Sequence, residues 1–167
     1  SIYIVLLIPV QALSTAANTM VSNLIGAGGV DGVMKLIRRI AGISLAIVAV
    51  CVLLMVVSPE MFLAVYTNEV ALLAESVPSA YVIGIAMLIA AVSNIYFNGI
   101  SGTGNTQAAL WLEGGTLVVY AFYIFIIGWW VQAPVSVCFT TEILYYLILL
   151  LASVIYLKKA KWQNKKI

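Results

Sequence analysis

Residues 33–57 read VMKLIRRIAGISLAIVAVCVLLMVV, with three basic residues in the first two turns and none charged from Ile40 to Val57. A helix needs about 20 mostly apolar residues to cross the hydrocarbon core of a bilayer. The stretch meets that requirement in one piece, whereas a strand of a membrane barrel would have about 10 residues of alternating character. Residues 33–57 therefore predict a membrane-spanning helix.

Four more stretches of similar length and composition lie on either side of this one. They cover about 2–25, 78–97, 108–131 and 135–157, and the span at 78–97 can extend back towards Asn68. Turns rich in Gly, or containing Pro, separate the five stretches. The sequence therefore predicts an all-α fold, a polytopic transmembrane helix bundle of about five spans.

The composition supports a membrane protein and excludes several classes of function. Hydrophobic residues make up 64% of the chain and charged residues 8%, against about 45–50% and about 25% in soluble domains. The lipid bilayer is therefore the expected surrounding, and no nucleic-acid partner is expected. The chain has no His, and neither a metal-ligand cluster nor a nucleophile beside a base can be found. We accordingly expect no enzyme activity, no metal site and no cofactor.

The basic residues fall into two groups. Lys35, Arg38 and Arg39 follow the first span, and five lysines lie in the tail 158–167. An alternating path through five spans puts both groups on one side of the membrane, and the positive-inside rule makes that side cytoplasmic. We expect a multi-pass protein of the cell membrane (inner or plasma membrane) with a cytoplasmic C-terminus.

Amide side chains lie inside two of the predicted spans. Gln11 and Asn18 share one face of the first span with small hydroxyl residues, and Asn94 and Asn98 lie one turn apart in the third. Polar groups within a span face another helix or a water-filled cavity. They either hydrogen-bond between helices or line a cavity, and the spacing alone does not choose between these interpretations.

Two carboxylates lie inside the last two predicted spans. Glu113, Tyr120 and Tyr123 fall on one face of the fourth span, and Glu142 lies in the outer half of the fifth. No basic residue lies inside either of these two spans to pair with the carboxylates. Each is expected to be protonated, paired outside these spans or bound to a cation, which makes both candidates for cation coupling. A snorkelling or structurally hydrogen-bonded Glu is the alternative.

Three segments in register resemble one known family of transporters. They are QALSTAANTMVSNLIGAGG (11–29), VYTNEVALLAESVPSAYVIG (65–84) and GISGTGNTQ (99–107), and the basic tail KKAKWQNKK (158–166) also fits. They are similar to helix ends and turns of the multidrug and toxic compound extrusion (MATE) family. Gly26 and Gly28 would form one such turn, and Gly102 and Gly104 the other.

This resemblance implies a twelve-helix transporter with two lobes of six helices around a central cavity. Residues 1–167 would be a partial C-terminal six-helix lobe, and the partner missing here would be the N-terminal lobe. The implied function is an antiporter that exports small organic compounds, often cationic, by alternating access. The coupling ion implied is Na⁺ or H⁺.

The sequence departs from the family pattern at two positions. Ala90 stands where several members carry an acidic residue, and Ser101 stands where many have Arg. A coupling carboxylate would then come from Glu113, Glu142 or the missing lobe. Two other functions remain open: a related flippase for lipid-linked oligosaccharide or polysaccharide, and a membrane scaffold subunit that does not transport.

Overall fold

Helices account for all the regular structure in the residues that the computed structural model describes, which are 2–59, 70–131 and 135–159. The α-helices are α1 (Ile2–Gly26), α2 (Val33–Val57), α4 (Val70–Gly102), α5 (Thr106–Phe125), α6 (Val135–Cys138) and α7 (Thr140–Lys159). A 3₁₀ turn, η1 (Val30–Gly32), precedes α2, and α5 continues into a π-helix, η2 (Ile126–Val131). The all-α prediction is therefore confirmed.

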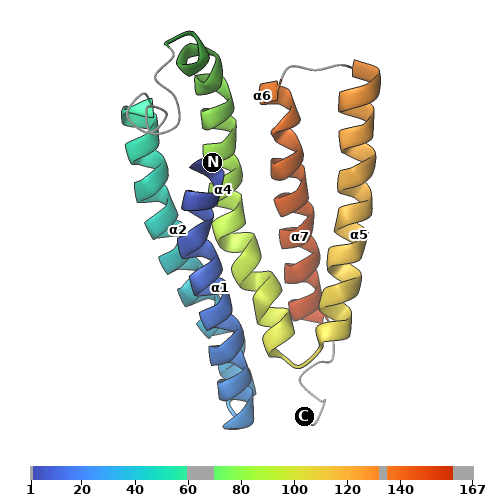
Figure 1. The fold of residues 1–167 in the computed structure, drawn as a ribbon. Coiled ribbons are helices and arrows are strands. Elements are labelled where there is room, and N and C mark those ends of the chain that lie inside the picture. The colour runs from blue at the N-terminus through green and yellow to red at the C-terminus, as the bar shows by residue number, and fades with distance from the viewer. Residues whose placement is uncertain (1, 60–69, 132–134, 160–167) are drawn as a thin grey trace.

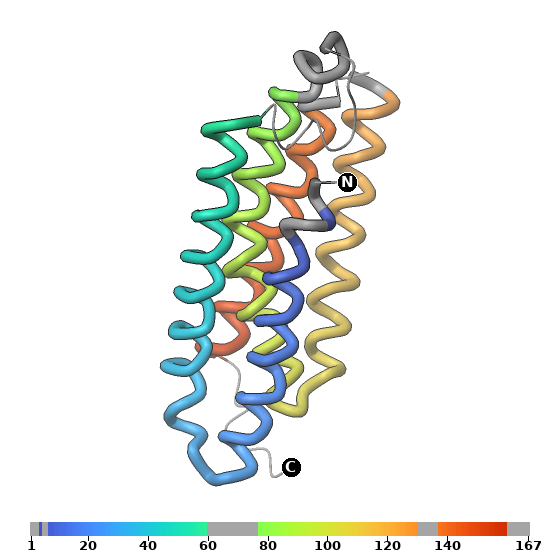
Figure 2. Tube along the Cα trace, turned by 60° about the vertical axis from the view of Figure 1, so that its left-hand side comes forward, coloured from blue at the N-terminus to red at the C-terminus, as the bar shows by residue number. Residues whose placement is uncertain are grey.

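Helix α4 is the central element of the bundle. It has 33 residues, a length of about 50 Å, and it packs against α1, α2, α5, α6 and α7. Figure 1 shows α1 and α2 on one side of α4, with α5 and α7 forming a second pair on the other. Figure 2 shows α2 beside α4 from another side. The bundle thus consists of two helix pairs joined through α4.

Four helices in the described part of the chain are long and apolar enough to cross a membrane. They cover Val30–Val57, Val77–Gly102, Thr106–Trp129 and Thr140–Lys159. Large apolar side chains also point outwards from the bundle, for example Leu110 at 70% and Phe122 at 67% exposure. An outer surface of this kind is stable in contact with lipid but not in contact with water. The chain is therefore a multi-pass membrane protein.

The helix boundaries agree closely with the predicted spans at α1 and α2 and differ at the others. α1 is helical over its predicted length, although it is not among the four helices above. α4 is longer than the predicted 78–97 because Pro78 lies within the helix, which membrane helices tolerate. The predicted 135–157 is divided at Phe139, between α6 and α7. The proposed extension to Asn68 lies outside the described residues.

The buried apolar side chains form two clusters at different heights along α4. The first includes Val21, Ile37 and Ile95, and the second includes Val52, Met87 and Tyr146. Both clusters combine residues of α1 or α2 with residues of α4 and α7. Packing through α4 therefore fixes the height of α7, and with it the position of Glu142.

Glycine allows α1 and α4 to approach closely near the first cluster. A Cβ atom on Gly102 would lie 2.7 Å from the Asn18 carbonyl oxygen and 2.9 Å from the Val21 Cβ. At the same place the Ser22 hydroxyl donates a hydrogen bond of 3.0 Å to the Gly102 carbonyl. Close backbone contact and small hydroxyl residues are typical of helix packing in membranes.

Lys35, Arg38 and Arg39 lie at the same end of the bundle as Lys158 and Lys159. Figure 1 shows α2 beginning and α7 ending at this lower end, which we call the basic end. The arrangement agrees with the alternating path that the sequence predicts. The rest of the tail, 160–167, lies outside the described residues.

Candidate functional site

Polar side chains on α5 and α7 meet between these two neighbouring helices. We call this contact the α5–α7 seam (Figure 1). Its members are Glu113, Thr116, Tyr120 and Tyr123 on α5, and Thr140, Thr141, Glu142 and Tyr145 on α7. The face of α5 that the sequence predicts as polar is therefore the face against α7.

Glu113 is held by a tyrosine from the opposite helix. The side chain is half-buried, and the Tyr145 hydroxyl donates a hydrogen bond to its Oε1 atom. The Tyr145 ring lies edge-on to Tyr120, with centroids 5.7 Å apart, and edge-on to Tyr146 at 5.0 Å. These contacts restrict the Tyr145 ring and so orient its hydroxyl towards the carboxylate.

Glu142, on α7, is likewise held by a tyrosine of the opposite helix, which here is α5. The Tyr120 hydroxyl donates a hydrogen bond of 3.3 Å to Glu142 Oε1. Glu142 lies in the first turn of α7, where the helix dipole favours a negative charge. One turn further along α5, Tyr123 Oη is 3.5 Å from Thr140 Oγ1.

The seam therefore contains two Glu–Tyr pairs, and each helix supplies one glutamate and one tyrosine. The ring contact between Tyr120 and Tyr145 connects the two pairs. No Lys, Arg or His occurs anywhere between Thr106 and Leu157. A phenol hydroxyl stabilises a carboxylate without neutralising it. The seam can thus hold a proton or a small cation, or a cationic group of a substrate.

Two buried threonines complete the seam. Thr116 and Thr141 are buried, at 2% and 3% exposure. The Thr116 hydroxyl donates a hydrogen bond of 2.8 Å to the Leu112 carbonyl oxygen within α5. The Thr141 hydroxyl donates one of 2.6 Å to the carbonyl oxygen of Cys138, the last residue of α6. They satisfy their own hydrogen bonds and let the helices approach closely.

Asn94 and Asn98 are half-buried on α4, and their amide nitrogens bond within that helix. Each nitrogen donates a hydrogen bond of 3.0 Å back along α4, to the carbonyl of Ala90 and of Asn94 respectively. On α1, Gln11 is exposed and Asn18 is half-buried. These four predicted residues thus lie on α1 and α4, whereas the two glutamates lie on α5 and α7.

A family model described as MatE matches residues 1–126, which is most of the 167 residues. The chain belongs to the MatE family. Members of this family are membrane transporters, which agrees with the helix bundle and its apolar outer surface. The match includes α5 with Glu113 and ends before α7 with Glu142. No curated protein and no solved structure matches the chain.

The glycine turns of this MatE chain have the backbone that such turns require. Gly28 has φ 81° and Gly104 has φ 77°, a left-handed conformation that glycine adopts without strain. Gly26 is the last residue of α1 and Gly102 the last of α4. These four glycines were predicted to have a structural role, and none of them belongs to the α5–α7 seam.

Two contacts of the MatE chain were not predicted from its sequence. Tyr145, which holds Glu113, was not among the predicted site residues. Asn105 donates to the Tyr156 hydroxyl, which joins the α4–α5 turn to α7. The sequence spacing could have indicated Tyr145 as a site residue, because it lies three residues after Glu142 and therefore on the same helix face.

The Tyr145→Phe substitution is expected to lower the free energy of unfolding in detergent by about 1 kcal/mol. The variant removes the hydroxyl that donates to Glu113 and leaves the ring contacts in place. Tyr81→Phe serves as the control, because Tyr81 is 41% exposed on α4. Thermal unfolding of both variants measures the difference. An equal loss of stability in both would contradict the assigned role of the Tyr145 hydroxyl.

Proposed function

We propose that this MatE chain takes part in cation-coupled antiport, in which export of a small organic cation is driven by entry of H⁺ or Na⁺. One observation carries the proposal. Two carboxylates lie between membrane-spanning helices, and each accepts a hydrogen bond from a tyrosine of the opposite helix. The family membership supports transport in general, and the seam supports the coupling.

The proposed coupling follows from competition for the same negative charges. A carboxylate surrounded by lipid and apolar side chains is costly unless a positive charge accompanies it. Glu113 and Glu142 can receive this charge from a proton, from Na⁺ or from an organic cation. Binding of the coupling ion then weakens binding of the organic cation, and the reverse. Antiport requires such a difference in affinity.

The aromatic rings of the seam suit the organic cation in this scheme. Tyr120 and Tyr145 stand beside the carboxylates, and their ring faces attract cations. Alternating access would open the seam first to one side of the membrane and then to the other. We place the basic end in the cytoplasm and the protein in the cell membrane, on the strength of the positive-inside rule. A second lobe would complete the cavity.

The experiment is a transport assay with the full-length protein in proteoliposomes. Vesicles are loaded with a cationic dye, and an inward gradient of H⁺ or of Na⁺ is imposed separately. The proposal predicts that one of the two gradients accelerates dye efflux and that an ionophore dissipating it removes the acceleration. Efflux that is equally fast with and without either gradient would refute cation coupling.

A further inference from the structure

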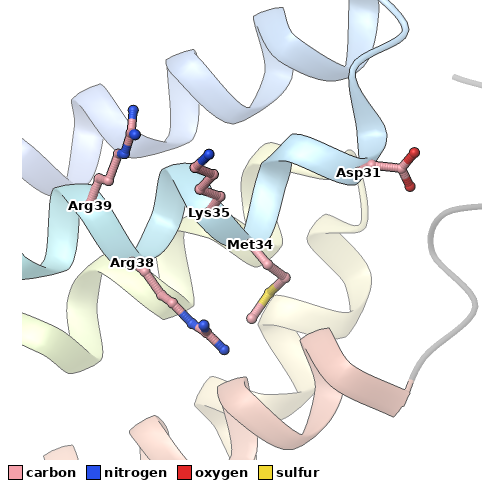
Figure 3. A pocket seen from close by; sticks show the side chains of 5 residues that line it. All are labelled: Asp31, Met34, Lys35, Arg38 and Arg39. Atoms are coloured by element: carbon pink, nitrogen blue, oxygen red, sulfur yellow. The ribbon is translucent and has the colours of Figure 1, made fainter.

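A second polar feature lies at the basic end, outside the α5–α7 seam. A pocket of about 510 Å³ at the start of α2 is lined by Asp31, Met34, Lys35, Arg38 and Arg39 (Figure 3). The three basic side chains are exposed, and they occupy adjacent positions on the first two turns of the helix. Within the described residues none of the three has an ion-pair partner.

The charges in this pocket favour an anion. Three cations and one carboxylate line the pocket. Figure 3 shows the Asp31 carboxylate at the far end, pointing away from the basic groups. Arg38 points to one side of α2, and Lys35 and Arg39 point to the other. α2 begins without a side-chain cap, so the positive end of its dipole adds to the attraction.

The surface next to the cations is apolar. Continuing along the same face of α2, Gly42, Ile43, Ala46, Ala49 and Val50 are all exposed. Ile43 is 54% and Val50 58% exposed, and a Cβ on Gly42 would meet nothing within 4 Å. These exposed residues are all apolar, so a hydrocarbon chain can pack against them. This stripe lies within the span Val30–Val57, at the depth of lipid tails.

We propose that this pocket binds the headgroup of an anionic phospholipid. Lys35 and Arg39, which point to the same side of α2, contact the phosphate, and Arg38 adds its positive charge from the other side. An acyl chain lies along the apolar stripe above them. Guanidinium groups bind phosphate through two parallel hydrogen bonds, and basic pockets beside membrane helices recognise acidic headgroups. The apolar stripe selects a lipid over a free phosphate ion. This inference does not depend on the proposed antiport.

The test titrates the purified full-length protein in detergent with phosphatidylglycerol and records binding by native mass spectrometry. Each cation that lines the pocket is expected to contribute about fivefold to the affinity for the headgroup, so R38Q/R39Q is expected to weaken binding about 25-fold. R38K/R39K retains the charge and should retain most of the affinity. K158Q/K159Q removes the same charge at the same end and is the matched control, expected to bind as the wild type does.

Three results would overturn the proposal. The first is an equal loss of binding in R38Q/R39Q and K158Q/K159Q, which would mean unspecific attraction by net charge. The second is unchanged binding in R38Q/R39Q. The third is displacement of the lipid by glycerol 3-phosphate at the same concentration, which would mean a site for a free anion. The melting temperature without lipid verifies folding, and Lys35→Gln provides a milder variant should R38Q/R39Q not fold.

Discussion

Replacing Glu113 and Glu142 together by Gln is expected to reduce gradient-driven dye efflux to the rate measured without a gradient. Each glutamine keeps the size of the side chain and an oxygen that can accept the tyrosine hydrogen bond. Each removes the negative charge, so neither a proton nor a cation can be exchanged there. The single variants E113Q and E142Q are each expected to lower efflux about tenfold.

Controls separate loss of coupling from loss of fold. Tyr81→Phe, on the exposed side of α4, should transport as the wild type does. Melting temperatures of E113Q and E142Q should stay near that of the wild type, because their cross-helix hydrogen bonds persist. Gradient-driven efflux that is undiminished in E113Q/E142Q would exclude the seam as the coupling site.

The Gly102→Ala substitution is expected to lower the free energy of unfolding in detergent by about 1–3 kcal/mol. The new Cβ would lie 2.7 Å from the Asn18 carbonyl oxygen and 2.9 Å from the Val21 Cβ. The first atom belongs to the backbone of α1 and the second is bonded directly to it, so neither can move aside by a change of rotamer. α1 must shift, and the hydrogen bond from Ser22 to the Gly102 carbonyl would be strained.

Gly115→Ala is the matched control for this prediction. A Cβ at Gly115 would meet nothing within 4 Å, and alanine favours helix by up to about 1 kcal/mol over glycine. The control should therefore be neutral or stabilising. Thermal unfolding of both variants provides the measurement. Equal stability of Gly102→Ala and Gly115→Ala would show that α1 and α4 are not in the close contact described here.

The helices could be predicted from the sequence because the bilayer restricts the choice of structure. A lipid-exposed backbone must bond within its own helix, so the length of an apolar run almost defines the element, as at 33–57. The bounds of α4 could not be predicted, because Pro78 resembles a helix start although the helix continues through it. The predicted span 135–157 passes over the break at Phe139, although the polar residues Thr140, Thr141 and Glu142 follow it directly.

The seam could be predicted in part. The spacing of Glu113, Tyr120 and Tyr123 indicates one face of one helix, and the structure shows that this face meets α7. Spacing cannot tell which residue of a second helix lies opposite, because the packing of both helices against α4 sets their relative height. The partners of the two glutamates, Tyr145 for Glu113 and Tyr120 for Glu142, therefore emerged only from the structure.

The central claim is that Glu113 and Glu142 change their bound ion when the transported compound binds. Infrared difference spectroscopy on the full-length protein, recorded on addition of the cationic dye, tests it most directly. We predict a change in the carboxyl bands that is reduced in E113Q, reduced in E142Q and absent in E113Q/E142Q. A wild-type difference spectrum without carboxyl bands, or one that the double substitution leaves unchanged, would contradict the account.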